Sequence, residues 1–89
     1  MTPFGQALIK ARPLIEHYRD DYICFALNRT GGRKFAKYIG ELLNPHLSYY
    51  SWVYNNHPEI YTQMNATPDA FREGRLQWMD YMIEQERLK

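Results

Sequence analysis

The side chains able to carry out chemistry are few and do not stand in a catalytic pattern. The chain has three histidines, His17, His46 and His57, and a single cysteine, Cys24. A hydrolase needs a nucleophile, a base and a group that orients the base, and none of these residues stands in a known motif of that kind. Each histidine is expected on a helix flank or beside a proline in a turn, where a local hydrogen bond is its ordinary role. We therefore expect no catalytic residue.

Metal and phosphate sites lack their usual spacing as well. The sequence has no pair of ligands within one helical turn and no Cys-x-x-Cys pair, so we expect no metal and no cofactor. The run Gly31 to Lys34 places glycines before a helix but lacks the rest of the G-x-x-x-x-G-K-[ST] pattern, so we interpret it as a turn that leads into a helix. The acidic pairs Asp20-Asp21 and Glu84-Glu86 are too close in sequence to face one substrate from a helix.

The residues with the clearest potential for binding lie between Arg29 and Tyr54, where cationic side chains and aromatic rings follow one another. Rings supply contact area at low entropic cost, and cations orient a charged partner. Four large rings within six residues cannot all face one core from a single helix, so part of the cluster should be exposed, although Trp52 could close the core. We predict a partner-binding surface made of Arg33, Lys34, Lys37, Tyr38, Tyr49, Tyr50, Trp52 and Tyr54.

The spacing of apolar residues predicts helices that position this cluster. The first begins at Thr2-Pro3, an N-cap followed by a proline, and its apolar face continues to Tyr18. Pro13 lies inside it and should kink the helix or restart it. A short buried helix follows near residues 20–28, and the two glycines of Thr30-Gly31-Gly32 should end it.

The rest of the chain contains four further predicted helices or turns. One helix contains Phe35 to Leu43 and stops at Asn44-Pro45. Residues 48–56 form a short helix whose candidate inward positions are Leu47, Tyr50, Val53 and Tyr54. A loop or single turn with Ile60, Tyr61 and Met64 comes next. The last helix has Thr67 as N-cap and Pro68 at its first position, and a broad apolar face that a second copy of the chain could share.

The composition fits one all-α domain over residues 1–89, a compact bundle of four to five helices. Hydrophobic residues make up 45% of the 89 residues and charged residues 24%, the balance of a globular domain. Residues 1–44 hold seven Lys/Arg against four Asp/Glu, and residues 45–89 hold four against six, so the halves carry +3 and −2. A lone buried cysteine, no signal-like N-terminus and no long apolar run predict a cytoplasmic protein without a membrane span.

Several short runs from Tyr22 onward carry a resemblance. They are Tyr22 to Leu27, Lys37 to Ile39 with Leu42-Leu43, Ser51-Trp52, His57 to Ile60 and Arg75 to Ile83. In the layout of these runs the chain resembles small phage and prophage accessory proteins. The resemblance implies a protein that binds and redirects or inhibits a host protein, including components of antiviral defence, or that regulates transcription. It supplies no functional residues.

We therefore predict a non-enzymatic, phage-like accessory protein that binds and modulates or inhibits a host macromolecule, in the first place a protein. The alternative is a DNA-binding regulator in which residues 35–40 support a recognition helix at residues 48–54, although that second segment contains no Lys or Arg. A third interpretation is a nucleotide-binding sponge in which rings stack on bases and Arg33 or Lys34 contacts phosphates. A homodimer stays open.

Overall fold

The computed structural model describes residues 1–17, 20, 22–41 and 49–89, and over these residues the chain is all-α with no strand. The helices are α1 (Pro3–Glu16), α2 (Ile23–Arg29), α3 (Arg33–Ile39), α4 (Ser51–Asn56), α5 (Pro58–Tyr61) and α6 (Pro68–Arg87). The five predicted helices are present, and the predicted single turn is α5. The all-α prediction is confirmed.

Helix α1 begins where the sequence predicts and passes through its proline. The Oγ1 atom of Thr2 accepts a hydrogen bond from the amide of Gly5 at 3.1 Å, so the N-cap satisfies one of the free amides of the first turn. Pro13 lies inside the helix, and the amide of His17 donates to the Pro13 carbonyl at 3.0 Å. The chain therefore does not restart at Pro13, although the sequence left that open. The predicted end of the apolar face at Tyr18 lies outside the described residues.

Helix α3 ends earlier than the sequence predicts. The prediction extended this helix to Leu43, but it stops at Ile39 because Gly40 takes a left-handed conformation with φ of 73°. Glu41 then turns inward and is buried, and its carboxylate accepts the amides of Ile23 at 3.0 Å and Cys24 at 2.6 Å. The negative charge satisfies the first amides of α2, which has no side-chain cap of its own. The predicted stop at Asn44-Pro45 lies outside the described residues.

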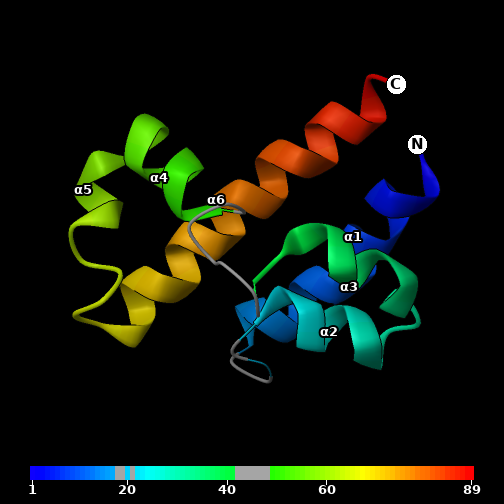
Figure 1. Ribbon diagram of the computed structural model, residues 1–89, viewed down its shortest axis with the longest axis horizontal. Helices are drawn as coiled ribbons and strands as arrows, with labels where there is room; N and C mark the ends of the chain where they lie inside the picture. The colour runs from blue at the N-terminus through cyan, green and yellow to red at the C-terminus, as the bar shows by residue number, and fades with distance from the viewer. Residues whose placement is uncertain (18–19, 21, 42–48) are drawn as a thin grey trace.

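Helix α6 is the longest described element; α1 packs mainly against it, and α4 and α5 contact both α6 and each other. Its N-cap is confirmed, because Thr67 Oγ1 accepts from the amide of Ala70 at 3.1 Å and Pro68 follows. Its 20 residues reach roughly 30 Å, close to the 32 Å length of the molecule. In Figure 1 it crosses the molecule diagonally, with α4 and α5 on one side and α1, α2 and α3 on the other. None of the described helices is both long enough and apolar enough to cross a bilayer.

The core lies mainly between α1, α2 and α6. Burial of an aliphatic side chain contributes about 1.5–3 kcal/mol, so this cluster is the main source of stability. On α6 the buried side chains include Trp78, Met79 and Ile83. The apolar face that a second copy could have shared is therefore used within the chain. The buried members are Ala7, Leu8, Ala11, Ile15, Ile23, Ala26, Leu27, Ile39, Tyr49, Val53, Met64, Leu76, Trp78, Met79 and Ile83.

Candidate functional site

The eight residues predicted to bind a partner lie in two separate regions of the molecule. Arg33, Lys34, Lys37 and Tyr38 belong to α3, which packs mainly on α2, whereas Trp52 and Tyr54 belong to α4, which packs on α5 and α6. Figure 1 shows α4 at the left end of the molecule and α3 right of centre. The cations and the rings therefore do not form the single surface that the sequence predicted.

The basic region on α3 is a solvated helix face. Arg33, Lys34, Lys37 and Tyr38 are all exposed, and 70% of the Tyr38 surface is accessible. The Lys37 ammonium lies 5.2 Å from the centre of the Tyr38 ring, and that of Lys34 lies 5.2 Å from the centre of the Phe35 ring. At exposed sites such contacts contribute only about 0.5–1 kcal/mol. The region offers charge to a partner but little preformed shape.

The glycine turn before α3 has a structural role. Gly31 has a φ of 89°, a conformation that side chains other than glycine rarely adopt. A Cβ at Gly32 would lie 3.1 Å from the Cβ of Ala7 and 3.0 Å from a methyl carbon of Leu27, so the glycine lets this turn approach α1 closely. These contacts agree with the interpretation of the run as a turn that leads into a helix.

Tyr49 lies in the core and has no surface for a partner to contact. Its exposed fraction is 0%, and its ring lies 6.1 Å from that of Trp78 and 6.3 Å from that of Phe71. Burial, and next the charge of Glu41, raise the pKa of the Tyr49 phenol. The prediction that Tyr49 contacts a partner is wrong for this conformation, because the chain just before α4 directs this ring toward α6.

The other rings of the predicted cluster lie at or near the surface. Tyr50 is half-buried against Phe71, with ring centres 6.1 Å apart, and burial raises the pKa of its phenol. Trp52 is half-buried and both packs against the core and stacks on Tyr81. The exposed fraction of Tyr54 is 59%, so its predicted inward position is wrong. Val53 is the inward residue of α4, and Leu47 lies outside the described residues.

Two tyrosines and a histidine complete an aromatic surface that the sequence reading missed. The Trp52 ring lies 5.1 Å from Tyr81 of α6 and 5.4 Å from His57, and Tyr54 meets Tyr61 of α5 edge to face at 5.0 Å. The helical spacing of α6 contains one indication that Tyr81 belongs to this surface. Tyr81 stands two residues after the buried Met79 and so projects from another side of α6. The rings form two contact groups, Trp52 with His57 and Tyr81, and Tyr54 with Tyr61; together we call these five side chains the aromatic surface.

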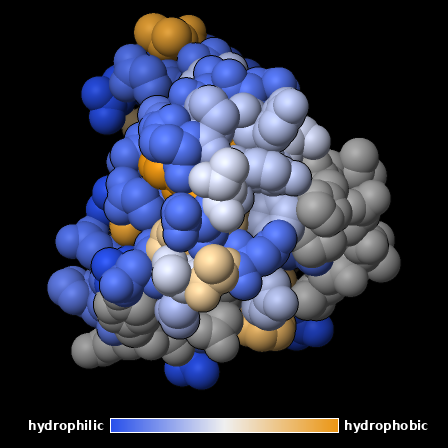
Figure 2. Space-filling view, turned by 90° about the vertical axis from the view of Figure 1, so that its left-hand side faces the viewer, coloured by the Kyte–Doolittle hydropathy of each residue, from blue (hydrophilic) through white to orange (hydrophobic). Residues whose placement is uncertain are grey.

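A small hollow opens beside this surface. It has a volume of about 230 Å³ and is lined by Tyr50, Ser51, Tyr54, Asn55 and Tyr61. We call it the tyrosine hollow. Figure 2 looks at the side of the molecule that carries α4 and α5, and its coloured surface is mostly pale to blue, with orange only in small separate areas. That colouring fits tyrosines and polar side chains, and it shows no broad aliphatic patch on this side.

The segment that forms α4, α5 and the start of α6 is acidic in sequence, but Arg72 follows it and forms an ion pair with Asp69 at 3.8 Å. Between Tyr49 and Phe71 the sequence contains no Lys or Arg and two carboxylates, Glu59 and Asp69. Glu59 is 73% and Asp69 80% exposed at the side chain. A DNA-binding surface needs cations that neutralise phosphates, and α4 and α5 contain no Lys or Arg of their own. The α3–α4 pair also lacks the direct packing of a helix-turn-helix among the described residues, since α3 packs mainly on α2.

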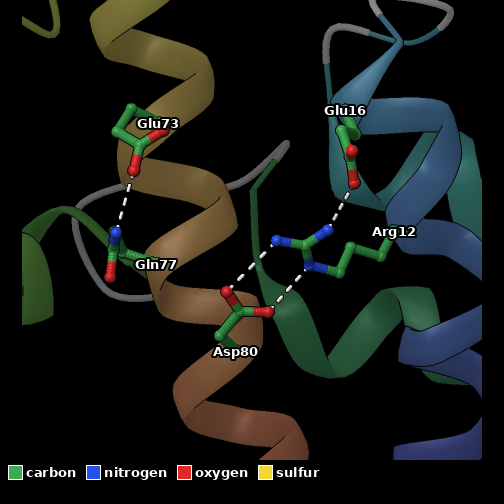
Figure 3. A network of polar contacts seen from close by, with 5 residues as sticks. All are labelled: Arg12, Glu16, Glu73, Gln77 and Asp80. Atoms are coloured by element: carbon green, nitrogen blue, oxygen red, sulfur yellow. Dashed lines mark hydrogen bonds and ion pairs between the residues drawn. The ribbon is translucent and has the colours of Figure 1, made fainter.

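A polar network at the surface joins α1 to α6 and continues along α6. Arg12 contacts Asp80 through two nitrogens, at 2.7 and 3.2 Å, and contacts Glu16 at 2.5 Å, as Figure 3 shows. In the same view Gln77 donates to Glu73 at 2.8 Å. The carboxylates of Glu16 and Asp80 thus contact the Arg12 guanidinium, and the carboxylate of Glu73 contacts the Gln77 amide. We assign the network to helix pairing.

The acidic pairs identified in the sequence also have structural partners. Asp20 forms an ion pair with Arg29 at 2.9 Å, and Asp21 lies outside the described residues. Glu86 is buried and contacts Lys89 at 2.7 Å and Thr2 at 2.8 Å, which ties the last turn of α6 to the start of α1. Glu84 instead lies 3.5 Å from Arg87. The two members of that pair face different partners.

The described histidines and the cysteine, which could act as bases or a nucleophile, lie on or beside different helices. Cys24 is buried, and burial together with the Glu41 carboxylate raises the pKa of its thiol to about 12, so the thiol is protonated at neutral pH. His17 is exposed at the end of α1, and His57 packs on Trp52. His46 lies outside the described residues. Among the described residues no three His, Cys, Asp or Glu side chains gather as a metal site would require.

Comparison of the chain with protein-family models, with curated proteins and with solved structures finds no match.

Proposed function

We propose that the protein acts without catalysis, as a small phage accessory protein that binds a host protein through the aromatic surface and so modulates or inhibits it. The observation that carries the proposal is the exposure of large rings on α4 and α6: Tyr54 is 59% exposed and Tyr81 42% exposed. Tyrosine and tryptophan dominate the energetics of protein interfaces because they bury much area and lose few rotamers.

The arrangement of these rings favours a protein partner over the two alternatives. Trp52 is held between Tyr81 and His57, so a partner meets rings that are already positioned. A DNA-binding regulator would need cations beside its recognition helix, and α4 has none. A nucleotide sponge would need rings and phosphate-binding cations together, but the cations belong to α3, in the other region. The proposal sets this binding in the host cytoplasm, where an unpaired cysteine such as Cys24 is ordinary.

The test is capture of a partner by tagged protein from a bacterial lysate, with and without nuclease. We compare wild type with the double variant Tyr54→Ala/Tyr81→Ala and with Tyr38→Ala, which removes a still more exposed ring from α3. Circular dichroism establishes that each variant is folded. Mass spectrometry then identifies what each protein retains.

The proposal expects one host protein retained after nuclease by wild type and Tyr38→Ala, and reduced at least tenfold with the double variant. Equal retention by the double variant would show that the aromatic surface is not the interface. Retention of DNA-associated proteins only when nuclease is omitted would favour the DNA-binding regulator. Retention of only the untagged chain itself would indicate a homodimer instead of a host partner.

A further inference from the structure

We propose that four exposed cations on α1 and α3 bind an acidic segment of a protein, rich in aspartate or glutamate. We call these cations the basic face: Lys10, Arg33, Lys34 and Lys37. The inference goes beyond the proposed function, because no residue of the aromatic surface takes part in it. The basic face would be a second binding surface, on helices that lie across α6 from α4 and α5 (Figure 1).

The cations of the basic face have no ion-pair partner among the described residues. The described carboxylates of the first half of the chain are engaged elsewhere: Glu16 pairs with Arg12, and Asp20 pairs with Arg29. Glu41 is buried and accepts two amides of α2. The positive charge of the basic face is therefore available to a partner, and a patch of this kind attracts anions.

Helix α3 presents its three cations on one side. At about 100° per residue, Arg33, Lys34 and Lys37 fall within an arc of about 100°. Ile39 lies on the opposite side of the helix and is buried. The seven residues of α3 reach about 10 Å, the length of about three residues of an extended peptide. A short extended segment can therefore contact all three cations.

A small hollow connects this helix to α1. It has a volume of about 150 Å³, and Lys10 and Lys34 line it together with the turn of residues 30–32. Among the described residues that line it there is no carboxylate. Glu86, which reaches the start of α1, is buried and contacts Lys89 instead. Pockets for drug-sized ligands have volumes of about 300–1,000 Å³, so we assign this hollow to a single acidic side chain of the segment.

The charge of the whole chain favours a short acidic segment over a nucleic acid. A DNA duplex carries one negative charge per about 1.7 Å and extends well beyond a helix of about 10 Å. Domains that bind it commonly have a pI above about 9, whereas this chain has a net charge of +1 and a pI of about 7.9. An acidic segment needs only the local charge of the basic face.

The test measures the binding of fluorescently labelled peptides of six glutamates, six glutamines and six lysines by anisotropy, in about 0.1 M salt. Wild type should bind the glutamate peptide saturably and neither of the others. Lys10→Gln/Lys34→Gln should weaken this binding about threefold to thirtyfold. Circular dichroism establishes that each variant is folded.

The matched control is Gln63→Glu/Asn65→Asp, which also lowers the net charge by two. Both residues are exposed and lie between α5 and α6, in the other region of the molecule. Charges more than about 10 Å apart are largely screened at this salt concentration, so the control should stay within about twofold of wild type. Equal weakening by the control would show that the peptide responds to net charge alone, and the inference would be wrong.

Two further results would overturn the inference. The first is binding of the glutamate peptide that Lys10→Gln/Lys34→Gln leaves unchanged. The second is tighter binding of a short DNA duplex that the same variant loses, which would assign the basic face to nucleic acid. The proposed function fails or stands separately, because the peptide assay needs no host protein and Tyr54→Ala/Tyr81→Ala leaves the basic face intact.

Discussion

The contact between α1 and α6 and the corner formed by α4 and α5 use similar kinds of residues in opposite ways. Helices of 14 and 20 residues can bury one continuous face against each other, and Leu8, Ala11 and Met79 are fully buried there. Helices of six and four residues have no such face, so their rings pack on one another and stay accessible. Short helices beside this longer pair therefore leave rings such as that of Tyr54 accessible.

Two tyrosines five residues apart show the contrast most clearly. Tyr49 is fully buried, and Tyr54 is 59% exposed. We expect Tyr49→Ala to lower the free energy of unfolding by about 3–5 kcal/mol, since it leaves a large cavity beside Trp78 and Phe71. Tyr54→Ala should change it by no more than about 0.5 kcal/mol. Urea denaturation measures both, and equal losses would mean that the corner is part of the core.

The elements were largely readable from the sequence because their signals are local. Thr2-Pro3 and Thr67-Pro68 fix the starts of α1 and α6 through a hydroxyl cap and a proline at the first position. Apolar spacing identified the buried side chains of α6 for the same reason. Local rules missed the early end of α3. There Gly40 ends the helix, and Glu41 turns inward and accepts the amide of Ile23, 18 residues earlier in the chain.

The candidate site was harder to predict because it depends on tertiary placement. Arg33 and Trp52 are near in sequence but belong to helices with different neighbours, and no local pattern separates them. Tyr49 lies just before α4, so the helical spacing of α4 did not apply to it. Tyr61 and Tyr81 join the aromatic surface only because α5 and α6 fold back beside α4.

Two glycines extend the comparison to backbone packing. A Cβ at Gly5 of α1 would lie 2.8 Å from the Cβ of Glu86, an atom fixed to the α6 backbone, whereas a Cβ at Gly74 would meet only the flexible end of Met64 at 2.9 Å. We expect Gly5→Ala to cost about 1–3 kcal/mol of unfolding free energy through overpacking. Gly74→Ala should change it by less than about 1 kcal/mol, because better helix propensity offsets the shift of Met64. Thermal and urea unfolding of both variants give the measurement, and a larger loss for Gly74→Ala would contradict the contrast.

The change of unfolding free energy at acid pH should report on the contact between the start of α1 and the end of α6. The hydrogen bonds from Lys89 and then Thr2 lower the pKa of Glu86 below its ordinary value of 4.5. A carboxylate whose pKa is lower in the folded state adds stability above pH 4.5, and that stability is lost as the pH falls through the folded value. Glu86→Gln should therefore cost about 1 kcal/mol at pH 7, and the difference from wild type should shrink below pH 4.5.

The matched control for that change is Glu84→Gln. Glu84 is an exposed neighbour whose partner Arg87 lies 3.5 Å away, so it should have little effect at either pH. If wild type and Glu86→Gln differ by the same amount at pH 3 and pH 7, the carboxylate charge of Glu86 does not contribute to the joining of the two helix ends.

The smallest effect is expected for the ion pair between Arg12 and Asp80, the residue that precedes Tyr81. Arg12 and Asp80 are partly exposed, so a double-mutant cycle of Arg12→Gln and Asp80→Asn should give a coupling of about 0.2–1 kcal/mol, toward the upper end because the contact is bidentate. The coupling should fall in 1 M salt. Asp80 precedes Tyr81 on α6, yet its side chain points to α1, so Asp80→Asn should leave capture of the host protein unchanged. Asp80→Asn could instead reduce capture as much as Tyr54→Ala/Tyr81→Ala does. The ion pair would then be holding Tyr81 in the orientation that the partner requires, and packing and binding on α6 would not be separate.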